Sequence, residues 1–126
     1  MNQNTTVSNG EWIIMELLWV KPYTLIELVT ELNESVGWSK STVATMVRRM
    51  SEKGIVSYTE QGRTKIFCPA VTREEVSIQE TKSLLQRAYH GSISLLVSTM
   101  AQENTLTPAD IEALYRILEE AKEEKK

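Results

Sequence analysis

The stretch WSKSTVATMVRRMSEKGIVSYTEQGRTK, residues 38–65, decides the fold of this chain. Ser39 stands where a helix N-cap is expected, because its hydroxyl can accept a hydrogen bond from a free backbone N–H of the first turn. Gly54 stands where a left-handed residue commonly ends a helix. Between them, apolar residues recur at the spacing of one helix face: Val43, Met46, Val47 and Met50. The stretch therefore opens with a predicted helix of about 15 residues, roughly 22 Å long.

The opposite face of this helix is polar, with small hydroxyl side chains toward its start and guanidinium groups further along. It comprises Ser41, Thr42, Thr45, Arg48 and Arg49. The major groove of DNA admits one such helix, with short side chains nearest the base edges. An alternative is an ordinary amphipathic helix with a solvated polar face, since the valine and methionine stripe indicates only a core face.

A β-hairpin is predicted directly after the helix. Residues 55–59 and 64–67 form two short alternating runs, and residues 61–63 between them have the composition of a turn with a basic tip. A helix followed by a basic-tipped hairpin is the arrangement of a winged helix-turn-helix. The tryptophans of the preceding segment, Trp12 and Trp19, are expected to be core anchors rather than a base-stacking platform.

Helices are predicted on both sides of this stretch from their capping signals. Three pairs fit a capping box, in which each side chain bonds the other residue's backbone N–H: Ser8 with Glu11, Thr24 with Glu27, and Thr72 with Glu75. The first two open helices that end near Val20 and Glu34, and Lys21-Pro22 separates them. Residues 1–7 are predicted to be a loose polar tail.

The segment after the hairpin is predicted to be helical throughout. A long helix from Thr72 to about Met100 should break at Gly91. A last helix should begin after Thr107, with Pro108 at its first position. The predicted fold class is thus mainly α with a small β-hairpin wing, organised as a winged-helix DNA-binding domain over residues 1–70 and a helical dimerisation region over 71–126.

The C-terminal helices carry apolar faces that need a partner. Two or three amphipathic helices are marginal as an independent core, and a two-fold dimer is the commonest solution. The predicted dimer interface comprises Leu84, Leu85, Tyr89, Leu95, Leu96, Ile111, Leu114 and Leu118. The alternative is that these helices pack back on the N-terminal domain.

Only the middle of the chain has a net positive charge, although the net charge of the whole is −3. Residues 1–35 hold one base and five acids, and residues 70–126 hold seven bases and ten acids. Residues 36–69 hold six bases and two acids, a local charge of +4. Because phosphate binding depends on local charge, this segment is expected to contact DNA. Its phosphate contacts are predicted to be Lys40, Arg48, Lys53, Arg63 and Lys65.

Composition and motifs argue against several other classes of protein. No apolar run approaches the ~20 residues of a membrane span, and the N-terminus does not resemble a signal peptide. A single cysteine, Cys68, cannot form an internal disulfide, so a reducing cytoplasm is expected. The one histidine, His90, has no nucleophile motif beside it. We therefore expect no enzyme activity, no metal site and no cofactor.

Three strings of the sequence resemble the penicillinase-repressor (BlaI/MecI) family of bacterial winged-helix transcriptional repressors. They are SNGEWIIMELLW (residues 8–19), WSKSTVATMVRRMSEKGIV (residues 38–56) and TPADIEALYRIL (residues 107–118). The resemblance covers nearly the whole chain and implies a homodimeric repressor of the antibiotic-resistance type that binds a palindromic DNA operator. The family's base contacts would fall on Ser41, Thr42, Thr45 and Arg49, with Arg63 and Lys65 of the wing on phosphates.

The sequence also departs from the family pattern. Ser41 and Ala44 stand where relatives often carry lysine and arginine. Relatives that control β-lactamase genes are inactivated by proteolysis at an Asn-Phe bond, and the matching position here is Thr99-Met100, a possible cleavage site for a sensor-linked protease. The copper-responsive branch carries C-terminal cysteines, which this chain lacks. The alternative function is a winged-helix protein-interaction module that does not read DNA sequence.

Overall fold

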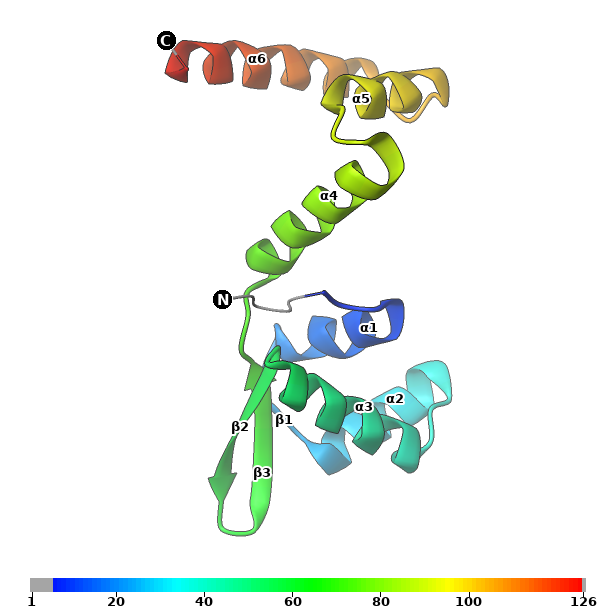
Figure 1. Ribbon diagram of the computed structural model, residues 1–126. Helices are drawn as coiled ribbons and strands as arrows, with labels where there is room; N and C mark the ends of the chain where they lie inside the picture. The colour runs from blue at the N-terminus through cyan, green and yellow to red at the C-terminus, as the bar shows by residue number, and fades with distance from the viewer. Residues whose placement is uncertain (1–5, 126) are drawn as a thin grey trace. The chain divides into compact units, whose positions relative to one another are not determined.

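The computed structural model describes residues 6–125, and the described part is mainly α-helical with one small sheet, as predicted (Figure 1). Its elements in chain order are α1 (Asn9–Leu18), β1 (Tyr23–Thr24), α2 (Leu25–Val36), α3 (Lys40–Lys53), β2 (Val56–Gln61), β3 (Thr64–Pro69), α4 (Arg73–Tyr89), α5 (Ile93–Gln102) and α6 (Pro108–Glu124).

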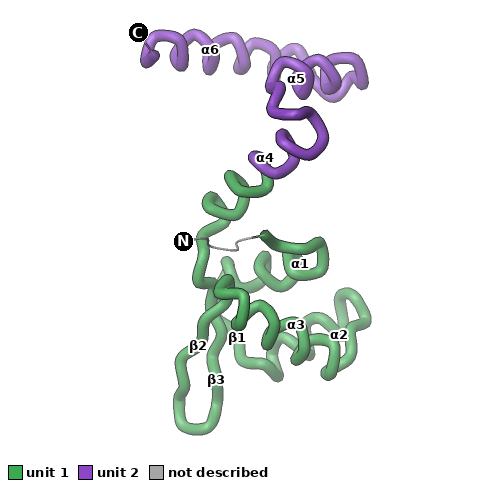
Figure 2. The backbone as a smooth tube through the Cα atoms, in the orientation of Figure 1, with its two compact units in different colours: residues 1–81 green, residues 82–126 purple. Residues whose placement is uncertain are grey.

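The chain forms two compact units whose boundary falls inside α4 (Figure 2). The first unit runs to Thr81 and the second begins at Lys82. The first unit extends past the wing because Val76 of α4 is fully buried in its core. The predicted boundary between residues 70 and 71 lies earlier in the chain, just after the end of β3. The dimerisation role given to residues 71–126 stays a prediction.

The core of the first unit lies between α1, α2, α3 and the sheet. The predicted apolar face of α3 is confirmed, because Val43, Val47 and Met50 are buried. Trp12 and Trp19 pack against this core with their rings edge to face, 5.6 Å between centroids. Both tryptophans are therefore anchors of the fold, as expected.

The sheet has three strands in the order β1-β3-β2, all antiparallel. The hairpin of β2 and β3 is confirmed, with a turn at Gly62 where φ is +65°. The third strand, β1, is an addition to the predicted elements, and it begins in the connection between the first two helices. It pairs Tyr23 with Phe67 and Thr24 with Ile66, which joins the wing to the start of α2.

The capping boxes at Ser8, Thr24 and Thr72 are confirmed by reciprocal hydrogen bonds of 2.8–3.2 Å. The prediction that residues 1–7 form a loose tail is wrong in part. Residues 1–5 lie outside the described part of the chain, but Val7 is only 4% exposed. Val7 occupies the position before the N-cap Ser8, where an apolar residue commonly packs against the first turns of its helix.

The second unit contains the end of α4 with α5 and α6. The predicted break lies at His90 and Gly91, where φ is +51° and +84°. The last helix begins after Thr107 as predicted, and reciprocal hydrogen bonds between Thr107 and Asp110 cap it. Neither α5 nor α6 has a buried residue, and an apolar groove of about 300 Å³ lies between them, lined by residues such as Leu96, Met100 and Leu114.

Candidate nucleic-acid interface

The start of α3 presents a small cluster of hydroxyl groups. The backbone N–H of Thr42 donates to Ser39 Oγ at 3.2 Å, and this hydroxyl donates to Thr42 Oγ1 at 3.1 Å. Ser41 Oγ lies 3.2 Å from the same Ser39 oxygen. Ser41 and Thr42 are exposed, and Thr45 one turn later is half-buried. Short polar side chains therefore line the exposed N-terminal half of α3, which is the part of a recognition helix that contacts base edges in helix-turn-helix proteins.

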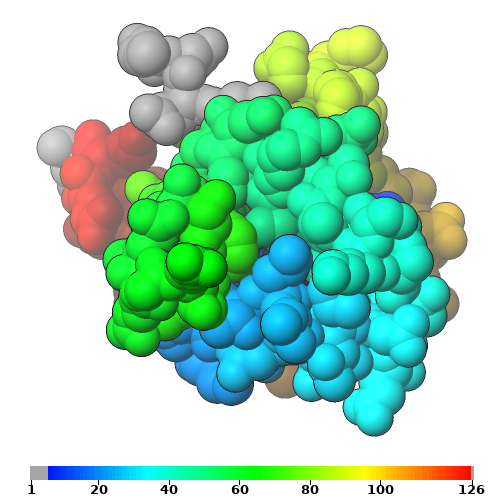
Figure 3. All heavy atoms as spheres, turned by 90° about the horizontal axis from the view of Figure 1, so that it is seen from below, coloured from blue at the N-terminus to red at the C-terminus, as the bar shows by residue number. Residues whose placement is uncertain are grey.

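A groove of about 690 Å³ lies between α3, the start of α2 and the wing. Figure 3 looks onto this face of the first unit, with α3 in teal, the wing in green and the start of α2 in light blue. Its walls are apolar at Leu25, Ile26, Val47, Tyr58 and Phe67. Its cations are four of the five side chains predicted to contact phosphate: Lys40, Arg48, Arg63 and Lys65. The fold thus gathers charges from two separate elements around one groove.

Tyr58 is a residue of this groove that the sequence interpretation missed. The Lys65 ammonium lies 4.5 Å from the centroid of the Tyr58 ring, a cation–π arrangement. The Tyr58 ring in turn packs edge to face on Phe67 at 5.7 Å. The alternation of the strand could have indicated its position, because alternate residues of a strand share a face. Val56, two residues before Tyr58, is a core residue. Tyr58 therefore supports Lys65 at the wing.

The two arginines of α3 have different surroundings. Arg49 is exposed and does not line the groove, whereas Arg48 does. Arg48 Nη1 lies 3.3 Å from Glu52 Oε2, one turn further along the helix. The charge of Arg48 is therefore shared with a carboxylate on the same surface.

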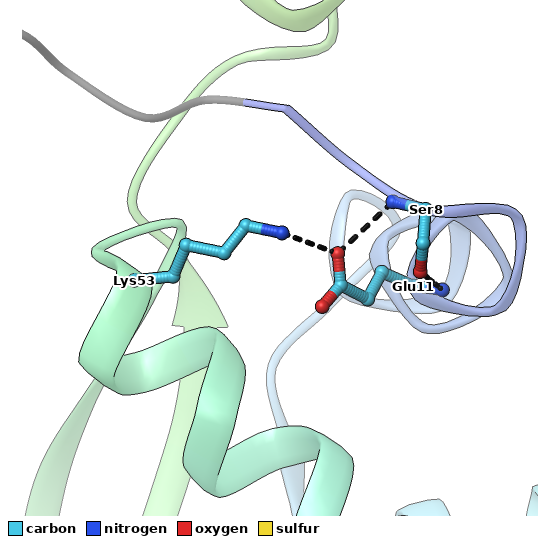
Figure 4. A network of polar contacts seen from close by, with 3 residues as sticks. All are labelled: Ser8, Glu11 and Lys53. Atoms are coloured by element: carbon cyan, nitrogen blue, oxygen red, sulfur yellow. Dashed lines mark hydrogen bonds and ion pairs between the residues drawn. The ribbon is translucent and has the colours of Figure 1, made fainter.

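The fifth predicted phosphate contact, Lys53, is held inside the first unit (Figure 4). Its Nζ lies 2.7 Å from Glu11 Oε1, and the two side chains are 21% and 13% exposed. Glu11 also accepts a hydrogen bond from the backbone N–H of Ser8 at 3.0 Å. Burial raises the pKa of Glu11, but the hydrogen bonds from Lys53 and Ser8 outweigh it, so the pKa lies below its usual 4.5. The structure thus gives Lys53 a partner within the fold, and its phosphate contact stays a prediction.

The beginning of α4 is fixed to α1 within the first unit. Arg73 donates two hydrogen bonds to the Glu16 carboxylate, at 2.7 and 2.6 Å, and its guanidinium lies 4.7 Å from the Trp19 ring centroid. The Trp19 indole N–H donates to the carbonyl of Val71 at 3.0 Å. Hydrogen bonding from Arg73 lowers the pKa of Glu16, and the same pairing raises the pKa of Arg73.

The possible cleavage position lies inside a helix. Thr99 and Met100 belong to α5, where the Thr99 hydroxyl donates to the Leu95 carbonyl at 2.9 Å. The Met100 carbonyl accepts from the backbone N–H of Thr105 at 3.0 Å. A protease that binds an extended substrate would need this turn to unfold first. Cleavage here stays a prediction.

No helix among residues 6–125 combines the length and apolarity that crossing a membrane requires. No group of three or more His, Cys, Asp or Glu side chains in that range is arranged to hold a metal ion.

A helix-turn-helix whose second helix exposes a polar face beside a hairpin defines a winged-helix DNA-binding protein. The profile of the penicillinase repressor family matches residues 7–120, and this chain belongs to that family. It is a DNA-binding transcriptional repressor, and the family is one of regulators rather than enzymes.

Curated relatives and a solved structure agree with this assignment. The penicillinase repressor of Bacillus licheniformis is 28% identical over 100% of this chain and 99% of its own length. The methicillin resistance regulatory protein MecI of Staphylococcus aureus is 24% identical over 93% and 96%. The DNA-binding domain of the repressor BlaI, solved in solution, superposes with a TM-score of 0.54 at 25% identity, covering 60% of this chain and 93% of that domain.

Proposed function

We propose that this chain represses transcription as a homodimer that binds a palindromic operator of specific sequence. The observation that carries the proposal is the placement of the exposed polar face of α3 beside a groove with four cations from helix and wing. Such a surface suits a helix in the major groove and a wing on the sugar-phosphate backbone. Its relatives are named as regulators of penicillinase and of methicillin resistance, which suggests that this chain controls genes for resistance to β-lactam antibiotics.

The roles of the side chains follow from their positions. Ser41, Thr42, Thr45 and Arg49 on the exposed face of α3 would contact base edges, and Arg49 is long enough to bond a guanine with both its amino groups. Lys40, Arg48, Arg63 and Lys65 around the groove would contact phosphates and fix the register of the helix. Lys53 would contribute at longer range, since Glu11 already pairs with it.

The dimer is supported by the apolar side chains that the second unit leaves exposed. Leu95 and Leu118, for example, are 48% and 61% exposed. A second copy packed on these helices would cover them, and a two-fold dimer suits a palindrome whose half-sites lie about one DNA turn or more apart.

The test is selection of genomic DNA fragments by the full chain at two salt concentrations, followed by sequencing. Enrichment of a palindrome, with an affinity that falls steeply as salt rises, is the expected result. Uniform weak binding would contradict sequence-specific repression. The absence of binding at either salt would instead favour a protein-interaction module.

A further inference from the structure

A carboxylate stands among the cations of the proposed DNA-facing groove. Glu52 lines this groove with Lys40, Arg48, Arg63 and Lys65, and among its described lining residues Glu52 is the one acid. It lies on the face of α3 opposite the buried Val43, Val47 and Met50. A negative charge at this place repels DNA phosphates, so its presence in a phosphate-binding groove needs a physical reason.

The stability of the fold does not supply that reason. The side chains of Arg48 and Glu52 are 60% and 65% exposed, and exposed ion pairs contribute little to stability. An arginine that precedes a glutamate by four residues is also the weaker order of such a pair along a helix. Glu52 moreover lies in the last turn of α3, where the helix dipole disfavours a negative charge.

We propose that Glu52 sets how selectively this chain binds DNA, by competing with phosphate for Arg48. When α3 docks in register on its operator, a phosphate comes close enough to replace Glu52 as the partner of Arg48. On unrelated DNA the approach is looser, Arg48 stays on Glu52, and its charge adds nothing to binding. Glu52 is thus a positioning residue that weakens non-specific binding more than specific binding. This inference rests on the proposed function.

The test compares the wild-type chain with Glu52→Gln on two duplexes of equal length, the selected operator and a random sequence, over a series of salt concentrations. On random DNA the variant should bind about two- to fivefold more tightly. The slope of log affinity against log salt should steepen by about 0.9, the equivalent of one more phosphate contact. Affinity for the operator should rise less, so the ratio of operator affinity to random-DNA affinity should be smaller for the variant than for the wild type.

Two matched variants separate this mechanism from a general change of charge. Glu31→Gln removes an exposed acid of α2 that does not line the groove, and it should change neither affinity nor salt slope. In an Arg48→Gln background, Glu52→Gln should no longer steepen the slope. An effect of the same size in that background would overturn the proposal, because it would not act through Arg48.

The failure of this inference is distinguishable from the failure of the proposed function. If the wild-type chain bound the operator and the random duplex with equal affinity, sequence-specific repression would be contradicted. The role of Glu52 in selectivity would be contradicted with it. A selective wild type whose affinity and salt slope on random DNA are unaltered by Glu52→Gln would overturn the inference alone. Thermal unfolding of each variant shows that the comparison is between folded proteins.

Discussion

Lys53 carries a positive charge near the end of α3, and its surroundings show why charge alone does not define a DNA contact. From the sequence it belongs with Lys40 and Arg48 as a phosphate contact. In the structure its ammonium pairs with Glu11, which is 42 residues away in the chain. Helical spacing identifies neighbours within a helix, but it carries no information about a partner on another element. The other four cations line one groove, and their contacts with phosphate stay predictions.

Replacement of Lys53 by methionine should destabilise the first unit. The variant keeps the aliphatic stem but leaves the partly buried Glu11 without its charged hydrogen bond, so we expect a loss of about 1–3 kcal/mol near neutral pH. Denaturant unfolding measures the difference. Lys40→Met, which removes an exposed lysine from the first position of the same helix, is the control and should not lower stability. Equal unfolding free energies for wild type and Lys53→Met would contradict a structural role for the pair.

The same pair predicts how stability depends on pH. The folded pKa of Glu11 is depressed below 4.5, so the ionised carboxylate stabilises the fold above that value. This contribution is lost as the pH falls through the folded pKa. In Lys53→Met the pKa is less depressed, so the unfolding free energy should decline less than in wild type between about pH 5 and pH 3. Parallel pH profiles for the two proteins would count against this assignment.

Of the three arginines at the proposed interface, Arg63 and Arg49 should differ in how their loss affects DNA binding. Arg63 at the wing is expected to contact phosphate, so Arg63→Gln should weaken binding to all sequences alike and reduce the salt slope by about 0.9. Arg49→Ala should cost about 1–3 kcal/mol at one base position if its guanidinium bonds a guanine. Binding titrations with single-base operator variants distinguish these outcomes. An equal loss on random DNA for Arg49→Ala would make it a phosphate contact instead.

At the scale of elements, local sequence patterns predicted the helices well and the sheet only in part. Capping boxes and glycines define helix ends through contacts within a few residues, which a sequence pattern contains. The strand β1 depends on pairing between Tyr23 and Phe67, far apart in the chain, and a two-residue strand has no alternation of its own. The hairpin was predictable because its two strands and turn are contiguous.

The left-handed residue at the end of α3 offers a direct test of its cap. Gly54 has φ of +89°, and a Cβ built there meets no atom within 4 Å, so any penalty is a backbone one. We expect Gly54→Ala to lower the unfolding free energy by about 1–2 kcal/mol. Gly54→Asn should lose less, because asparagine tolerates this conformation. If thermal or denaturant unfolding gave equal losses for both variants, backbone conformation would not be the cause.

At the scale of the whole molecule, the sequence contained the segregation of charge but not the shape that uses it. The +4 segment is visible in the residues alone. The groove forms only when the wing and the start of α2 fold beside α3. Tyr58 of the wing and Ile26 of α2 then line the same groove as the cations. The sequence likewise shows apolar helix faces in the second unit without showing what covers them.

Assembly of the chain can be tested on the exposed face of α6. Leu118 is 61% exposed, so its replacement by glutamine should leave the fold of one chain intact while weakening the proposed dimer. Sedimentation equilibrium should show a dissociation constant raised about tenfold, which corresponds to roughly 1.4 kcal/mol. Glu120→Gln, an exposed polar position on the same helix, is the control. A wild-type chain that sediments as a monomer would contradict the dimer itself.

The gathering of cations at one groove, with acidic segments before and after it in the chain, has a kinetic consequence. The cations gathered at the groove of the first unit should be attracted by the field of DNA before any contact forms, so encounters that begin with this groove toward the duplex should be favoured. Ionic strength should then act mainly on the rate of association, while the lifetime of the bound state depends on the close contacts of α3. We therefore expect this repressor to associate with DNA rapidly despite its negative net charge. Its dissociation rate should depend on how well α3 fits the site.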